Sequence, residues 1–237
     1  MTDWKVGTVT DTRTETPTGR SIMIAVDGWP GNLAGQHLDL RLTAPDGYQA
    51  VRSYSIASAG DGESVQLAVD RFPTGEVSPY LVDELLPGDQ LEVKGPLGRW
   101  FVWTPDDTRP IQLIAGGSGI VPLIAMAREH AASGSTTPFR LLYSVRTPAD
   151  RFFADELAAL ESDLFRVDYV YTRETPADWP VPAGRVTADV IASATIPAAD
   201  APGVFVCGPT AFVEVVARWL VDLGHEPQSV KTERFGG

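Results

Sequence analysis

Three glycines between an apolar stretch and a predicted helix have the spacing of a phosphate-binding turn. They are Gly116, Gly117 and Gly119, in the sequence AGGSGIVP. Glycine lets a backbone approach a phosphate closely, and the N-terminus of a helix presents unpaired amide donors and the positive end of its dipole. Pro122 stands where the usual dinucleotide fingerprint has its third glycine, so a tight turn without a ligand remains the alternative. A hydrolase nucleophile elbow is not expected, because Ile120 replaces the glycine that it needs after Ser118.

A second group of residues has the chemistry to hold a planar, phosphorylated cofactor. The first segment is RSYS, with Arg52, Tyr54 and Ser55, and the second is GEVS, with Gly75, Val77 and Ser78. An arginine can clamp a phosphate, an aromatic ring can stack on a flat ring system, and a hydroxyl can bond a ring nitrogen. The second segment is a glycine-led helix start with a hydroxyl cap, which suits a pyrophosphate. Taken singly, an exposed strand and a plain capped helix explain the two segments equally well.

The elements that position these residues change in type near the middle of the chain. In the first hundred residues, short strands alternate with Gly-, Pro- and Asp-rich turns, which favours a small antiparallel barrel. Strands are expected at residues 5–10, 21–26, 37–42, 51–57, 65–70 and 90–94, and a helix at residues 78–86.

After a polar link at residues 104–110, strands alternate with helices, which predicts a parallel sheet covered on both faces. The expected strands are residues 111–115, 139–144, 165–171, 204–207 and 230–233, and the expected helices are residues 122–132, 150–160, 188–194 and 211–223. The fold class is therefore an N-terminal antiparallel barrel followed by a C-terminal α/β domain.

Composition excludes several other classes of function. The net charge of −12 argues against nucleic-acid binding, which needs a basic face. Cys207 is the only cysteine, so the chain cannot form an intrachain disulfide or an all-cysteine metal or iron–sulfur site. The three histidines lack the spacing of metal ligands. Since no long apolar run and no signal-like N-terminus are present, we expect no membrane span and a cytoplasmic location.

The order and spacing of five motifs resemble the ferredoxin–NADP reductase superfamily, especially the bacterial stand-alone reductases of oxygenase and ferredoxin systems. The motifs are RSYS, GEVS, GGSGIVP, Cys207-Gly208-Pro209 and Glu233-Arg234-Phe235. The resemblance covers nearly the whole chain. It implies an FAD-binding barrel over residues 1–105 and an NAD(P)-binding α/β domain over residues 106–237.

The resemblance assigns roles on the flavin side. Arg52 would hold the flavin pyrophosphate, Tyr54 would stack on the isoalloxazine ring, and Ser55 would lie near flavin N5. The pyrophosphate would also be held by the segment containing Gly75, Val77 and Ser78. FMN in place of FAD remains open, although FAD is favoured.

On the nicotinamide side, Gly116, Gly117 and Gly119 match the turn that receives the nicotinamide cofactor. Cys207 would lie beside the reactive nicotinamide carbon, in a pocket shaped by Gly208 and Pro209. Phe235 resembles the aromatic residue that shields the flavin until nicotinamide displaces it, and Glu233 is expected near the flavin edge. In some NADP-linked relatives, arginines at the places of Arg146, Arg173 and Arg185 grip the 2′-phosphate, which favours NADPH over NADH; three solvated surface arginines are the alternative.

The resemblance implies a reductase that takes a hydride from NADPH or NADH onto FAD and passes single electrons to a separate ferredoxin or oxygenase component. Two alternatives remain. One is a reductase of free flavins, quinones or metal ions without a protein partner. The other is a non-catalytic subunit that senses flavin or nucleotide, although Ser55, Cys207 and Phe235 argue against it because a sensor needs no hydride-transfer geometry.

Overall fold

The N-terminal half of the chain is an antiparallel barrel. The computed structural model describes residues 3–236, and its first sheet has the strand order β4-β3-β6-β1-β2-β5. Its strands are β1 (Lys5–Thr16), β2 (Gly19–Val26), β3 (His37–Thr43), β4 (Gln49–Ser55), β5 (Ser64–Asp70) and β6 (Gln90–Leu97). An antiparallel bridge between Ile56 and Leu67 brings the end of β4 against β5 and closes the barrel. Alternate side chains such as Ile22, Ile24 and Val26 on β2 point inward and are fully buried, as the period of a strand requires.

The C-terminal half is a parallel sheet with helices on both faces. Its strands run in the order β11-β10-β7-β8-β9. They are β7 (Ile111–Gly116), β8 (Phe139–Val145), β9 (Phe165–Tyr171), β10 (Gly203–Pro209) and β11 (Val230–Phe235). The helices are α1 (Ile120–Ser133), α2 (Ala154–Leu160), α3 (Ala188–Ala194) and α4 (Thr210–Asp222). Among residues 3–236, no helix is both long and apolar enough to cross a membrane. The predicted fold class is confirmed, whereas the boundary at residue 105 stays a prediction.

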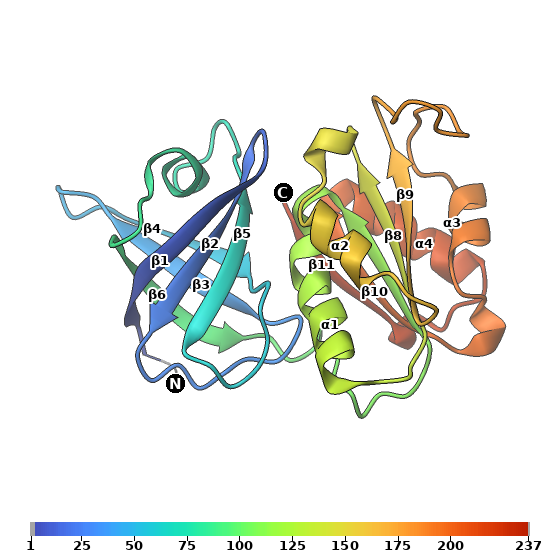
Figure 1. The fold of residues 1–237 in the computed structure, drawn as a ribbon, viewed down its shortest axis with the longest axis horizontal. Coiled ribbons are helices and arrows are strands. Elements are labelled where there is room, and N and C mark those ends of the chain that lie inside the picture. The colour runs from blue at the N-terminus through green and yellow to red at the C-terminus, as the bar shows by residue number, and fades with distance from the viewer. Residues whose placement is uncertain (1–2, 237) are drawn as a thin grey trace.

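The two faces of the parallel sheet have separate cores. Leu113 and Ala115 of β7 pack with α1 and α2, while Ile114 packs with α3 and α4 on the other face. The first core also includes Ala34 of the barrel and Phe101 of the connecting segment, so it continues across the domain boundary. Figure 1 shows the barrel and the parallel sheet side by side, with α1 and α2 next to the barrel.

Two expected helices are shorter in the structure. The helix expected at residues 78–86 is present over residues 78–84, and its last five residues, Tyr80–Glu84, form a π-helical turn. Prolines at positions 79 and 87 flank it, and the Arg20 guanidinium donates to the carbonyls of Val82 and Leu85 at 3.2 and 2.7 Å, so it holds the turn from outside.

The helix expected at residues 150–160 is divided. A 3₁₀ turn, Pro148–Asp150, ends before Phe153, whose φ of 56° lies in the left-handed region, and α2 begins only at Ala154. Thr147 and Asp150 cap the 3₁₀ turn reciprocally, which favours a separate short element there.

The 3₁₀ turn Gly117–Gly119, which leads into the long helix α1, lies directly against strand β10. A Cβ atom added to Gly119 would lie 2.1 Å from the carbonyl oxygen of Cys207 and 2.7 Å from the amide nitrogen of Gly208. Both atoms belong to the backbone of a buried strand, so neither can move aside cheaply. Glycine at position 119 is thus required by helix–strand packing.

We therefore predict that Gly119→Ala lowers the free energy of unfolding by about 1–3 kcal/mol, because α1 must move away from β10. Gly184→Ala is the matched control, since a Cβ there meets nothing within 4 Å and its φ is not positive. It should change stability by less than about 0.5 kcal/mol. Urea unfolding of both variants measures the difference, and equal stabilities would contradict the packing role of Gly119.

Candidate active site

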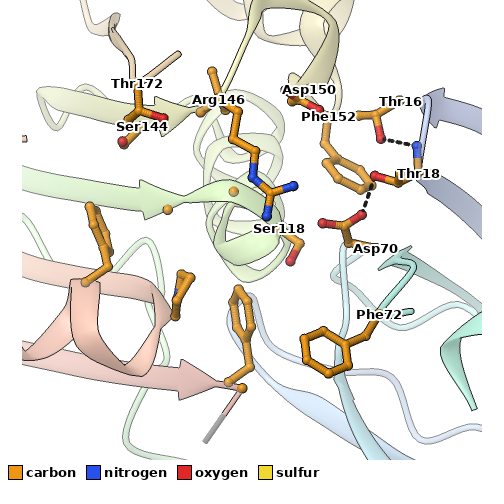
Figure 2. A pocket seen from close by; sticks show the side chains of 17 residues that line it. Thr16, Thr18, Asp70, Phe72, Ser118, Ser144, Arg146, Asp150, Phe152 and Thr172 are labelled. Carbon is orange, nitrogen blue, oxygen red and sulfur yellow. Dashed lines mark hydrogen bonds between the residues drawn. The ribbon is translucent and has the colours of Figure 1, made fainter. Parts of the chain in front are cut away.

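A cleft of about 430 Å³ lies between the two domains at the carboxyl ends of the parallel strands (Figure 2). Five of the predicted site residues line it: Gly116, Gly117, Arg146, Pro209 and Phe235. Open parallel sheets bind ligands at this edge, because the strand ends and the helix N-termini meet there. Figure 2 shows the Arg146 side chain extending into the cleft toward Ser118. The cleft therefore has the position and the donors of a nucleotide site.

Glycines bring the backbone close to the cleft. A Cβ on Gly116 would lie 2.8 Å from Cδ1 of Phe212, and a Cβ on Gly208 would lie 2.9 Å from the same atom. Gly117 has a φ of 54° and open space around its Cα, so its conformation, not crowding, requires glycine. Gly119 does not line the cleft and instead packs α1 on β10.

A second cavity of about 260 Å³ brings together predicted residues from both domains. Ser55 at the end of β4 and Cys207 of β10 both line it, although they are far apart in the sequence. Glu233 and Phe235 of β11 line it as well, with His37, Ser53 and Arg234 completing the wall. Phe235 also lines the larger cleft, so its ring stands where the two cavities meet.

Burial shifts the pKa values of three side chains of this second cavity toward their uncharged forms. Burial, and then the nearby charge of Glu233, raise the pKa of the Cys207 thiol far above its usual range. Burial alone raises the pKa of Glu233 to about 7, and it lowers the pKa of His37, against a smaller opposite effect of Asp39. The 3.8 Å between His37 Nδ1 and Glu233 Oε1 is within ion-pair range, but both shifts favour the uncharged forms, so we regard the contact as weak. In their uncharged forms these three side chains can lie against an apolar or neutral ring, while the Arg234 guanidinium in the same wall lies 3.5 Å from the Glu214 carboxylate.

The strand that carries Ser55 presents a charged and an aromatic side chain. The Arg52 guanidinium donates to Glu76 at 2.7 Å, and both side chains are 51% exposed. An exposed pair of this kind is worth about 0–1 kcal/mol, so a stronger anion could replace Glu76 cheaply. Tyr54 is half-buried, and burial raises its pKa to about 12, with Arg52 acting in the opposite direction. Its neutral ring is suited to stacking.

The segment around Gly75 forms a tight turn held by Ser78. The Ser78 hydroxyl accepts a hydrogen bond from the amide of Phe72 at 3.0 Å, and the Gly75 amide donates to the Phe72 carbonyl at 2.8 Å. A Cβ on Gly75 would lie 3.0 Å from that hydroxyl oxygen. The Val77 side chain is buried in the barrel core, so only its backbone can face a ligand. Together with Arg52 this turn supplies donors and a side-chain-free approach, which fit a pyrophosphate-bearing flavin.

Of the three arginines expected to bind a 2′-phosphate, one lines the cleft and two do not. Arg146 follows β8 and lines the cleft. The Arg173 amide donates to the Arg146 carbonyl at 2.9 Å, and Arg185 follows Gly184, whose amide donates to the Tyr171 carbonyl at 2.9 Å. The side chains of Arg173 and Arg185 are exposed outside the cleft lining. The backbone thus gathers all three positions beyond the ends of β8 and β9.

Sequence reasoning missed most of the cleft wall. The residues missed are Thr16, Thr18, Asp70, Phe72, Ser118, Ser144, Val145, Asp150, Phe152, Thr172, Phe212 and Gly236. Ser144 and Thr172 stand at the carboxyl ends of two parallel strands, and that position could have identified them. The barrel residues carry no such signal, because only the contact between the domains brings them to the cleft.

Comparisons with known proteins match each of the two domains to a family. The profile of the "Oxidoreductase FAD-binding domain" family matches residues 29–102, and that of the "Oxidoreductase NAD-binding domain" family matches residues 113–218. NADH-cytochrome b5 reductase 1 of Coccidioides immitis is 35% identical over 81% of this chain and 65% of its own length. The same protein of Aspergillus oryzae is 34% identical, with coverages of 81% and 68%. The reductase component of propane 2-monooxygenase of Mycolicibacterium smegmatis is 30% identical, with coverages of 78% and 54%.

Solved structures share the whole arrangement of the two domains. The FAD/NAD-binding domain of nitric oxide dioxygenase from Vibrio cholerae superposes with a TM-score of 0.87 at 24% identity, covering 98% of this chain and 99% of its own. A cytochrome P450 reductase from Amycolatopsis superposes with a TM-score of 0.85 at 28% identity, with coverages of 99% and 70%. This chain spans about 65% of the length of the cytochrome b5 reductase from Coccidioides immitis.

The raised pKa of Glu233 predicts a pH-dependent stability. The folded protein holds this proton more tightly than the unfolded chain, so the resulting stability is complete below about pH 4.5 and is lost as the pH rises through about 7. The stability of wild type relative to Glu233→Gln should therefore fall by about 2 kcal/mol between about pH 5 and pH 8. Urea unfolding at the two pH values tests this, and a difference that does not change with pH would refute it.

Proposed function

Because this chain belongs to the ferredoxin–NADP reductase superfamily and is an FAD-dependent NAD(P)H oxidoreductase, we propose that it passes single electrons from its flavin to a separate redox partner. One observation carries the proposal. Ser55 of the barrel and Cys207 of the α/β domain line one cavity, and Phe235 lines both that cavity and the cleft that Gly116 and Gly117 line. Two domains that each bind one cofactor need such a meeting point.

FAD, when bound, supplies the chemistry of accepting a hydride and releasing electrons one at a time. Arg52 would leave Glu76 and donate to the pyrophosphate, where the turn containing Gly75, Val77 and Ser78 adds its amide donors. Tyr54 would stack on the flat ring. These contacts would hold the cofactor. They are separate from the cavity of about 260 Å³ that Ser55 and Cys207 line, which we call the reaction cavity.

The reaction cavity would align the two rings. Ser55 would donate a hydrogen bond to the flavin edge, and the neutral Cys207 thiol would fill the space beside the nicotinamide. Phe235 would cover the flavin until the nicotinamide displaces it. Its position at the end of β11, exposed to 40%, leaves room for that movement. Alignment of this kind is worth several orders of magnitude in rate, because the reacting atoms must approach to about 3–3.5 Å.

A ferredoxin or an oxygenase component is the partner that we favour. The relatives include the reductase component of a propane monooxygenase and a cytochrome P450 reductase, whose names place them in oxygenase systems. Cys207 is the only cysteine in residues 1–237, so these residues cannot supply the four cysteine ligands of an iron–sulfur cluster. Reduction of candidate ferredoxins by the holoenzyme identifies the acceptor.

We propose NADPH as the preferred electron donor. Arg146 extends into the cleft, and the backbones of Arg173 and Arg185 are gathered beside it. Guanidinium groups bind phosphate through several charge-assisted hydrogen bonds, and NADH lacks the 2′-phosphate that would receive them.

The first prediction from this function separates holding the flavin from reducing it. Ser55→Ala and Cys207→Ala should retain about one FAD per chain and slow flavin reduction about tenfold to a thousandfold, because they change alignment and not the pyrophosphate contacts. Arg52→Ala should do the reverse and lose FAD. Single-turnover reduction and flavin content, measured on the same samples, test this. A colourless wild-type protein that takes up no FAD would refute the function, whereas unchanged rates in both cavity variants would refute only the placement of the reaction.

The second prediction concerns the nicotinamide. Arg173→Ala, more than Arg185→Ala, should raise the KM for NADPH about ten- to a hundredfold and leave the KM for NADH nearly unchanged, because only NADPH loses a charge-assisted phosphate contact. Steady-state dye reduction with each donor measures the two KM values. A wild type that prefers NADH, or a variant that weakens both donors equally, would show that these arginines are solvated surface residues.

A further inference from the structure

One arginine connects the two domains directly. Arg128, in the middle of α1, donates through Nη1 to the carbonyl oxygen of Ala57 at 2.7 Å and to Oε1 of Gln66 at 2.6 Å. Both acceptors belong to the barrel, at the place where it closes: the Ala57 amide donates to the Gln66 carbonyl at 2.7 Å, next to the bridge between Ile56 and Leu67. We call this pair of hydrogen bonds the Arg128 bridge.

The Arg128 side chain is held in place from its own domain. Its Nε and Nη2 atoms donate to the two carboxylate oxygens of Glu156 on α2, at 2.6 and 2.7 Å. Its guanidinium lies 5.1 Å from the ring centre of Phe153, and only 25% of the side chain is exposed. A bidentate pair fixes the plane of the guanidinium, so the remaining Nη1 group points at the barrel without a further loss of side-chain freedom.

A second contact between the domains lies beside the first. The Phe153 amide donates to Oε2 of Glu15 at 3.2 Å, and the Glu15 side chain is only 5% exposed and also accepts from the Ser21 hydroxyl at 2.8 Å. Phe153 adopts a left-handed conformation, with a φ of 56°, which is strained for a residue other than glycine. The turn lets Phe152 line the cleft while Phe153 contacts Arg128. A strained backbone conformation of this kind persists where the surrounding contacts hold it in place.

The two ends of the Arg128 bridge lie on the elements that carry the proposed chemistry. Ala57 follows the flavin-side residue Ser55 by two positions, and Arg128 belongs to the helix that begins directly after the turn of Gly117 and Gly119. We propose that Arg128 is a positioning residue that fixes the spacing of the nicotinamide turn from the flavin strand, and so sets the rate of hydride transfer without touching either cofactor. This inference rests on the proposed function.

The rate of hydride transfer depends steeply on the alignment of the two reacting groups. A displacement of about 1 Å between the reacting groups can cost about a hundredfold in rate. The connecting segment joins the domains at one place, and the apolar contacts across the boundary have no direction, whereas the Arg128 bridge has fixed donor and acceptor positions. Loss of the bridge should therefore widen the range of domain orientations and lower the fraction that is aligned.

The test uses the FAD-loaded full chain and its Arg128→Met variant, which keeps an unbranched side chain and removes every donor. We expect the limiting rate of flavin reduction by NADPH to fall about ten- to a hundredfold, with the half-saturating NADPH concentration unchanged within about twofold. Reoxidation of the dithionite-reduced variant by ferricyanide should remain at the wild-type rate, because it needs no alignment of the domains. Arg128→Lys, which can still reach Ala57 and Gln66 but cannot pair with both oxygens of Glu156, should recover part of the lost rate.

Arg41→Met is the matched control, because Arg41 makes a bidentate pair with Glu92 entirely within the barrel, through Nε at 2.9 Å and Nη2. It should lower stability and leave flavin reduction unchanged. Hydrogen exchange gives a readout independent of activity: the Phe153 amide should exchange faster in Arg128→Met and at the wild-type rate in Arg41→Met.

The outcomes separate the inference from the function on which it rests. If NADPH does not reduce the flavin of the wild-type protein, the proposed function itself is refuted. With an active wild type, an Arg128→Met variant that is reduced within about twofold of the wild-type rate, or that changes only the half-saturating concentration, overturns the positioning role. If Arg128→Met does not fold, Gln66→Met, which removes one acceptor of the bridge, decides by the same criteria with a smaller expected loss.

Discussion

The close contact between Gly119 and the backbone of Cys207 constrains the whole α/β half of the active site. It brings the turn that leads into α1 onto β10. One edge of the sheet therefore carries the amides of that turn, the Cys207 thiol, and the floor formed by Gly116 and Gly208. A side chain on Gly119 would separate them. The fixed helix then carries Arg128 toward the barrel, so the same contact also determines where the two domains touch. The cleft, the reaction cavity and the domain contact thus share one origin.

Much of the architecture could be predicted because it depends on local patterns. Continuous apolar strands such as β7, the glycine-rich turn after it and the RSYS strand are visible as short sequences, and all lie in the elements expected for them. The cavity that joins Ser55 to Cys207 also followed from the order of the motifs, although their roles in catalysis remain predictions. The type of each element could be predicted because burial of a strand on both faces requires a continuous run of apolar residues.

The remaining features depend on contacts between residues distant in the sequence. The helix expected at residues 78–86 ends at residue 84 in a π-helical turn, and Arg20 of β2 donates to the carbonyls of Val82 and Leu85 at this end. Phe153 interrupts the helix expected at residues 150–160 because its amide bonds Glu15 of the other domain. Thr16 and Asp70 reached the cleft wall in the same way. None of these partners has a fixed spacing along the chain, so a pattern of residue types cannot reveal them.

The acceptors that bind the Arg128 guanidinium differ in how easily a mutation removes them. The oxygen at Ala57 belongs to the backbone, so a substitution there leaves the acceptor in place as long as the strand end keeps its path. The acceptors at Gln66 and Glu156 belong to side chains, and a single codon change can remove either one. Descendants of this protein are therefore free to vary position 57 among small apolar residues. Positions 66, 128 and 156 are expected to change together, as one coevolving group.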